Sequence, residues 1–176
     1  MNFASLVVLT AARRITALIR SDQSDIFGIC DRRSMRVVDS SAKLPQHGIG
    51  FTACLSSSSG VNIGYLQTIE FDNVITNDGN GFDSRHGVFR APVSGLYHFS
   101  MTISSTKSHP MVIHMVKDGN ELIHSYLGDS DYLSSTQDVN VRLNAGQDVW
   151  CRNSQNYNAL INAANYSCFS GHLISV

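Results

Sequence analysis

The chain has 176 residues, of which 43% are hydrophobic and 15% charged, and its formal net charge is -1. This length suits one globular domain with an extension and allows a sizeable buried core. A nearly neutral chain has no overall attraction for nucleic acid or acidic membranes, and no apolar run is long enough to span a bilayer.

Residues 1–47 form an N-terminal extension with two interpretations. Phe3–Ala12 is apolar and ends in small residues, as the core of a secretory signal does, although basic residues follow it instead of preceding it. The alternative is an amphipathic helix that runs to about Arg20. Residues 21–47 show no clear periodicity, and Pro45–Gly48 marks the edge of a linker.

From Ile49 onward the chain is a series of short strands separated by turns. Asp118-Gly119 is a strong hairpin signal. The expected strands are Ile49–Leu55, Leu66–Phe71, Met111–Val116, Glu121–Tyr126, Val139–Leu143, Asp148–Arg152 and Cys168–Val176. No helical pattern occurs after residue 48. Residues 48–176 are therefore predicted to form an all-β domain, either a sandwich or a jelly roll.

Phe71–Phe99 has the most ordered pattern in the chain. It reads as a strand, a long turn-rich loop, a short strand, a tight turn and a long strand. The loop is rich in Asn, Asp and Gly, which tolerate left-handed backbone or bond their own main chain. From Tyr97 to Ile103, apolar and polar residues alternate, which is typical of a half-buried strand.

This stretch resembles the signature of the complement component 1q globular domain, whose fold is related to that of tumour necrosis factor. The matching positions are Phe71, Asn77, Phe82, Phe89, Gly95, Tyr97 and Phe99. Met101 stands where the family usually has an aromatic residue. Gly50–Ala53, Leu143–Trp150 and Phe169–Ile174 resemble other segments of the same family, so the resemblance covers about residues 48–176.

The resemblance implies a jelly roll of about ten antiparallel strands whose first and last strands lie side by side. Such domains usually assemble as trimers, with flat aromatic-rich flanks around a threefold axis, and generally work outside the cell. The sequence has no Gly-X-Y repeat and no sustained heptads, so neither a collagen stalk nor a coiled coil is expected. A homotrimer would have to be held by the globular domain itself.

The four cysteines lack the spacing of a structural zinc site. Cys151 and Cys168 flank one predicted loop, and a disulfide between them would remove about 3 kcal/mol of unfolded-chain entropy. We favour this bridge, with two buried free thiols as the alternative. The family resemblance makes Cys54 a rival partner for Cys168, because it sets their strands together. Cys30 lies outside the domain.

Neither catalysis nor a metal site is indicated by a complete motif. The sequence has no Gly-x-Ser-x-Gly, no His-Glu-x-x-His and no phosphate-binding glycine loop, so no enzyme activity is expected. His98 and His114 lie on predicted strands and could pair across a sheet as metal ligands, but strand histidines are more often ordinary surface residues. Asp129 and Asp131 could hold calcium, although their loop lacks the rest of a calcium-binding pattern.

Two loops have the composition of a ligand-binding surface. Amide side chains both donate and accept hydrogen bonds, as sugar hydroxyls require, and tyrosine rings offer an apolar face. The candidate ligand-binding residues are Asp129, Asp131, Tyr132, Asn153, Asn156, Tyr157 and Asn158. Asn165-Tyr166-Ser167 is an N-glycosylation sequon, which places Asn165 as an acceptor if the chain is secreted.

Two classes of function follow. The first is a secreted, lectin-like module of innate immunity that binds carbohydrate or microbial surface ligands as a homotrimer. The resemblance implies this function, because lectin-like members of the complement component 1q family act in this way. The second is a cytokine-like or extracellular-matrix protein that binds a protein receptor. No cofactor is expected for either, although calcium could bind in the first.

Overall fold

The structure is a computed structural model that describes residues 48–106 and 110–176. The signal segment, the amphipathic helix and the domain boundary expected within residues 1–47 lie outside this part, so they stay predictions. Its described residues contain no helix long and apolar enough to cross a membrane.

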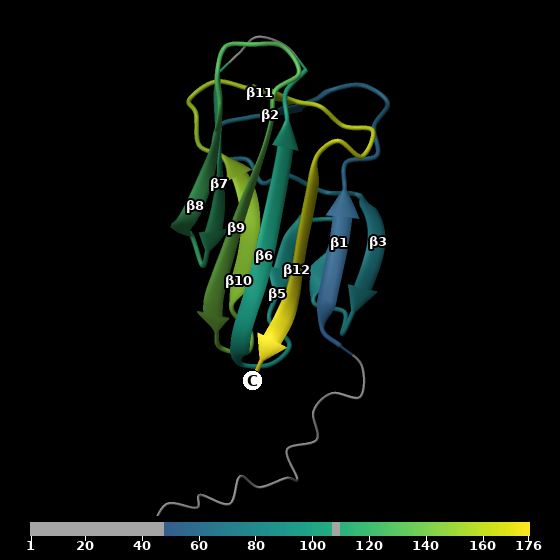
Figure 1. The fold of residues 1–176 in the computed structure, drawn as a ribbon, viewed down its shortest axis with the longest axis vertical. Coiled ribbons are helices and arrows are strands. Elements are labelled where there is room, and N and C mark those ends of the chain that lie inside the picture. The colour runs from purple at the N-terminus through teal and green to yellow at the C-terminus, as the bar shows by residue number, and fades with distance from the viewer. Residues whose placement is uncertain (1–47, 107–109) are drawn as a thin grey trace, which may run out of the picture. The chain divides into compact units, whose positions relative to one another are not determined.

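The described residues form an all-β fold of two five-stranded sheets and a small two-stranded sheet (Figure 1). The first sheet has the order β3-β1-β12-β6-β9 and the second the order β4-β5-β10-β7-β8, while β11 pairs with β2. The strands are β1 (Gly50–Cys54), β2 (Val61–Ile63), β3 (Asn73–Asp78), β4 (Phe82–Asp83), β5 (Val88–Arg90), β6 (Gly95–Ser104), β7 (Met111–Lys117), β8 (Asn120–Leu127), β9 (Ser134–Leu143), β10 (Asp148–Asn153), β11 (Ala159–Ile161) and β12 (Cys168–Ser175).

Most of the expected strands are confirmed, but β9 begins at Ser134 instead of Val139, β2 and β11 were not expected, and two further segments differ. The β7–β8 hairpin turns at Asp118 and Gly119, whose φ angles of 47° and 86° are the positive pair that a two-residue hairpin favours. Leu66–Phe71 is not a strand, and only Thr68 makes an isolated bridge, to Arg152. Conversely, Asn73–Asp78, expected in a loop, is the edge strand β3.

The core is an interlocked group of aromatic rings from both sheets. Phe51 of β1 stacks on Phe82 and Phe89 of the second sheet, with ring centroids 4.5 and 5.1 Å apart. Phe169 of β12 meets Phe51 edge-on at 4.9 Å. Offset-stacked and edge-on pairs are the favoured arrangements of aromatic rings. The five aromatic residues of the Phe71–Phe99 signature are all buried in this core.

The remaining signature residues hold the backbone around these rings. Asn77 fixes the turn between β3 and β4, because its Nδ2 donates to the Phe82 carbonyl at 2.9 Å and its Oδ1 accepts from the Phe82 amide at 3.1 Å. The Tyr97 hydroxyl donates to the Val93 carbonyl at 2.8 Å, and burial raises the pKa of Tyr97. A Cβ at Gly95 would lie 2.5 Å from the Ser175 carbonyl oxygen, so only glycine fits there.

The expected Cys151–Cys168 disulfide is wrong, and the rival pairing is present. Cys54 and Cys168 face each other in the antiparallel β1–β12 pair and are bonded, with their Cα atoms 4.0 Å apart. Cys151 lies on β10 in the other sheet and is a buried free thiol. Burial raises the pKa of the Cys151 thiol well above its ordinary value. Cys151 and Cys168, although only one connection apart in the expected strand order, therefore lie in opposite layers of the sandwich.

Removing the disulfide should destabilise the domain strongly. The bridge joins residues separated by 114 positions, and closing a loop of that size reduces unfolded-chain entropy by about 5 kcal/mol in the loop-closure model. We expect the double variant Cys54→Ala/Cys168→Ala to lose about 2–5 kcal/mol of unfolding free energy in urea titrations. A reductant should lower the stability of the wild type and of Cys151→Ala, but not of the double variant. A Cys151-containing disulfide peptide in a non-reducing digest would contradict the pairing.

Gly171→Ala should also destabilise the fold, through the aromatic core. A Cβ at Gly171 would lie 2.4 Å from the Phe99 ring and 2.9 Å from the Phe51 ring. Overpacking of this kind costs about 1–3 kcal/mol, measurable as a lower midpoint of chemical unfolding. Gly48→Ala is the matched control, because a Cβ there has no neighbour within 4 Å. Equal stability of the two variants would contradict the packing described above.

Candidate functional site

The two loops with ligand-binding composition are both attached to one connection of the chain. Residues 128–133 join β8 to β9, and residues 154–158 join β10 to β11. Ser105, at the start of the β6–β7 connection, donates its amide to the Leu133 carbonyl at 2.8 Å and also bridges to Ile161 of β11. At the other end of this connection, the Pro110 carbonyl accepts from Tyr157. The end of the molecule that carries this connection is at the top of Figure 1.

The 154–158 loop is held by hydrogen bonds to Pro110 and Val112 that leave a ring and two amides exposed. The Tyr157 hydroxyl donates to the Pro110 carbonyl at 2.7 Å, while the residue remains 43% exposed. Asn156 and Asn158 on either side of it are exposed. Ser154 donates its amide and its hydroxyl to the Val112 carbonyl, both at 3.0 Å. The loop therefore presents a fixed aromatic face between two amides.

Asn153 does not belong to this exposed set, which corrects one expected ligand contact. Its side chain is buried, and the Nδ2 donates to the carbonyls of Ile63 and Tyr157 at 2.9 and 2.7 Å. The Oδ1 accepts from the Gln155 amide at 2.9 Å. With its amide engaged in this way, Asn153 holds the loop in place and cannot reach a ligand. The sequence shows that position 153 is an asparagine but not that its side chain points inward.

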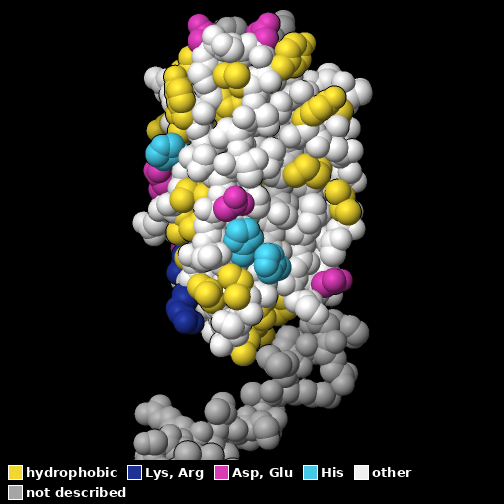
Figure 2. Space-filling view, viewed as in Figure 1, with side chains coloured by type: hydrophobic (Ala, Val, Ile, Leu, Met, Phe, Trp, Pro, Cys, Tyr) yellow, Lys and Arg dark blue, Asp and Glu magenta, His cyan; other side chains and the backbone are white. Residues whose placement is uncertain are grey.

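The 128–133 loop is exposed from Asp129 to Leu133, and three of its side chains are the expected ligand contacts. Tyr132 is 73% exposed and has a positive φ of 55°. Asp129 and Asp131 are exposed beside it, and Figure 2 shows acidic side chains at this end of the molecule. Among the described residues, the two aspartates do not belong to a group of three or more potential metal-binding side chains. Calcium at this loop stays a prediction. The name loop surface is used below for Asp129, Asp131, Tyr132, Asn156, Tyr157 and Asn158.

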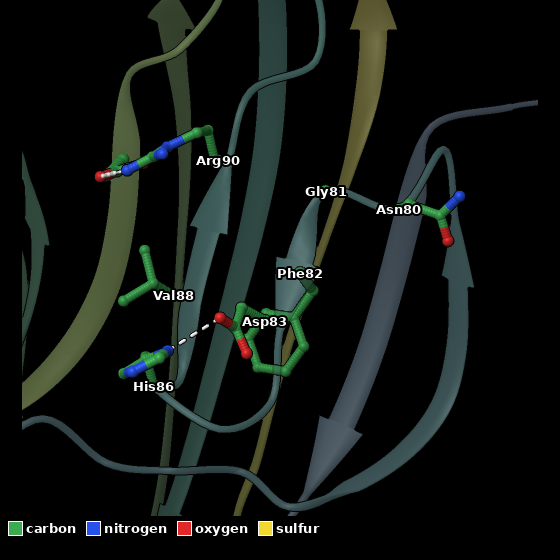
Figure 3. Close-up of a pocket in the computed structure, with 8 residues that line it drawn as sticks. Asn80, Gly81, Phe82, Asp83, His86, Val88 and Arg90 are labelled. Carbon is green, nitrogen blue, oxygen red and sulfur yellow. Dashed lines mark hydrogen bonds and ion pairs between the residues drawn. The ribbon is translucent and has the colours of Figure 1, made fainter.

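A polar groove lies elsewhere, along β4, β5 and β10, and the sequence did not indicate it. It has a volume of about 360 Å³ and is drawn in Figure 3. Arg90 forms a bidentate pair with Asp148, with both nitrogen–oxygen distances 2.8 Å. Asp83 lies 2.8 Å from the Nδ1 of His86, and this hydrogen bond is the main cause that lowers the pKa of Asp83. Arg90 and Asp148 thus neutralise each other, while the carboxylate of Asp83 is engaged by His86. Its lining residues are Asn80, Gly81, Phe82, Asp83, His86, Val88, Arg90 and Asp148.

His98 and His114 do not form the metal pair that their strand positions allow. His98 lies on β6 of the first sheet, and His114 on β7 of the second. The Nδ1 of His98 is 2.9 Å from the Asn140 Oδ1, and its ring lies 5.2 Å from that of His172. The two histidines therefore have separate surroundings on opposite layers.

The outer face of the first sheet carries no Asp, Glu, Lys or Arg on its two central strands, β6 and β12. It presents small polar side chains such as Thr102 and Thr136, whose hydroxyls are 2.9 Å apart. Figure 2, which views the molecule from this side, shows neighbouring histidine side chains among mainly uncharged atoms. The exposed tyrosines of the described residues lie outside this sheet, at Tyr65, Tyr126, Tyr132, Tyr157 and Tyr166. The expectation of an aromatic-rich flank does not hold for this face.

Comparison with known proteins agrees with the resemblance of the Phe71–Phe99 signature. The family model described as C1q domain matches residues 50–174. The chain is 32% identical to human complement C1q tumor necrosis factor-related protein 3 over 114 residues, which is 61% of this chain and 44% of that protein. It is 32% identical to mouse complement C1q tumor necrosis factor-related protein 6 over 109 residues, which is 59% of this chain and 41% of that protein. The match thus spans less than half the length of these relatives.

Solved structures show the same jelly-roll fold. The globular domain of zebrafish complement 1qA protein aligns with a TM-score of 0.60 at 20% identity, covering 72% of this chain and 97% of that one. Murine APRIL, solved at pH 5.0, aligns with a TM-score of 0.58 at 12% identity, covering 73% of this chain and all of that one. C1q and tumour-necrosis-factor-like domains are binding modules without enzymatic activity. With a match over residues 50–174, the chain belongs to the C1q domain family.

Proposed function

We propose that this chain is a secreted pattern-recognition module that binds carbohydrate or microbial surface ligands as a homotrimer in innate immunity. The observation that carries the proposal is the exposed ring of Tyr157, fixed by its hydroxyl to the Pro110 carbonyl and flanked by Asn156 and Asn158. A sugar offers an apolar C–H face and hydroxyls that donate and accept, which suits a ring between two amides. A preformed surface also reduces the entropy lost on binding.

Two features support secretion. The Cys54–Cys168 disulfide is of a kind that persists in oxidising compartments. Asn165 of the sequon is exposed, and its Oδ1 accepts a hydrogen bond from Asn73 at 2.8 Å, so this bond does not use the nitrogen that a glycan would join. Glycosylation of Asn165 stays part of the proposal.

Trimer formation would make weak sugar binding useful, because linked sites raise the effective concentration of ligand. C1q domains typically form trimers, and the outer face of the first sheet is the surface that we assign to the contact between copies. Its half-buried hydroxyls around Thr102 can pack closely with little charge to desolvate.

Sugar binding should depend on the 154–158 loop. We expect the wild type to bind a subset of sugars on an array of mammalian glycans and bacterial polysaccharides. The variant Asn156→Ala/Tyr157→Ala should bind them about tenfold more weakly, since a few lost hydrogen bonds and one ring contact cost about 1.4 kcal/mol or more. Tyr126→Ala, which removes a similarly exposed ring from β8 (61% exposed), is the matched control.

The same array distinguishes the alternatives. Repeating it with a calcium chelator, and with Asp129→Asn/Asp131→Asn, tests whether calcium takes part. No sugar or lipopolysaccharide bound by a folded trimer would contradict the proposal. Capture of a protein receptor that survives an excess of free sugar would instead favour a cytokine-like or matrix role.

The oligomeric state should respond to a charge on the first sheet. We expect the wild type to have the mass of three chains in light scattering, and Thr102→Glu to dissociate. The new carboxylate would be buried between copies without a cation and near Asp138, whose neighbour in the β6–β9 register is Ser100. Tyr126→Glu places the same charge on the other sheet and should leave the trimer intact. A trimer that tolerates Thr102→Glu would assign the contact to another face.

A further inference from the structure

We propose that His114, Glu121 and His124 form a binding site for a divalent transition metal ion of the zinc class, on the outer face of the β7–β8 hairpin. Each of the three side chains offers one ligand atom, and these atoms all lie within 4.8 Å of one another. It is the single such group of three among the described residues. It lies apart from the loop surface, and no step of the proposed sugar binding requires it.

The strand register and a β-bulge bring the three side chains to one face. His114 and His124 are direct partners in the antiparallel pair, and directly opposed side chains share a face. Glu121 is three residues from His124, an odd spacing that would place it on the opposite face of a regular strand. The register shifts between Met115 and Val116, which leaves one extra residue in β8. The bulge therefore turns Glu121 to the side of the two histidines.

Burial along β8 agrees with this interruption of the side-chain alternation. Leu122 and Ile123, which are adjacent in sequence, are both half-buried and pack against the core. Glu121 and His124 on either side of them are exposed. An exposed carboxylate at this point is thus set by the backbone of the hairpin and not by a side-chain rotation alone.

The distances suit a shared ion. The Glu121 carboxylate lies between the two rings, with one oxygen 2.7 Å from the His124 Nδ1 and the other 3.2 Å from the His114 Nδ1. Tetrahedral zinc with bonds of about 2.0–2.2 Å separates its ligand atoms by roughly 3.3–3.6 Å. His124 is exposed, so its side chain is free to rotate toward that spacing.

The ligand types select the class of metal. Two imidazole nitrogens and one carboxylate suit zinc, copper or nickel, whereas calcium and magnesium prefer sets made of oxygen. Three protein ligands leave a coordination position for water or for a group on a bound partner.

One neighbouring charge opposes the ion. Arg152 of β10 is the register partner of His114 on its other side, and one of its guanidinium nitrogens donates to the Gly119 carbonyl at 3.3 Å. A fixed positive charge next to the site weakens the binding of a cation. The arrangement therefore predicts binding of moderate strength that becomes tighter when Arg152 loses its charge.

The test is a metal titration of the purified, disulfide-bonded full chain, stripped of metal beforehand. Cobalt(II) reports the nitrogen and oxygen ligands through its visible absorption, and zinc should displace it from the same site. We expect His124→Gln and Glu121→Gln to weaken binding by at least about tenfold, since even loss of a residue that merely orients a metal ligand has an effect of that size. Arg152→Gln should strengthen binding.

His98→Gln and His172→Gln are the matched controls, because these histidines also lie close together, with rings 5.2 Å apart, but on the other sheet. They should leave the site intact. His124 and Glu121 are exposed, so circular dichroism should show both variants folded. Absence of cobalt and zinc binding to the wild type would overturn the proposal. Binding that survives His124→Gln and Glu121→Gln would overturn it too, by placing the ion on other side chains.

Discussion

The stacking of Phe51 on rings of the opposite sheet is the constraint from which the rest of the structure follows. Phe51 contacts Phe82 and Phe89 across the sandwich, and Phe169 closes on its edge. Together these rings fix the distance between the two sheets and the way in which one sheet faces the other. The glycine at position 171 is required because the Phe51 and Phe99 rings occupy the space of a side chain there. Rings packed this tightly leave the loops at the ends free to differ without disturbing the layers.

The parts of this fold that could be predicted are those where one face of a strand is buried. In β6 the buried and half-buried residues alternate along the strand, and the same alternation is visible in the sequence. Asn73–Asp78 carries no such pattern, because β3 is an edge strand without a fully buried side chain. Leu66–Phe71 has the apolar residues of a strand without being one, because Ile69 and Phe71 are buried from an irregular segment.

The errors at the site have a similar origin. Spacing along the chain placed Cys151 near Cys168, but it cannot say which layer a strand enters, and the two cysteines face different sheets. Composition identified the exposed amides and rings of the loop surface, yet it could not show that Asn153 turns inward to hold its own loop. Glu121 lies on the same face as the two histidines only because of a β-bulge. In a strand with regular alternation, Glu121 would point to the opposite face from His124. Composition can be read from the sequence, whereas side-chain direction depends on the local backbone.

The position of the Cys54–Cys168 bond also governs how the domain carries mechanical load. β1 and β12 pair from Gly50 and His172 to Cys54 and Cys168, and the bond lies at the far end from the points where the chain enters and leaves. A force that pulls the two ends of the chain apart would break the β1–β12 hydrogen bonds one after another. This separation would stop at the covalent bond between Cys54 and Cys168. The segment of 114 positions between the two cysteines would then bear no tension, because the covalent link carries the load past it.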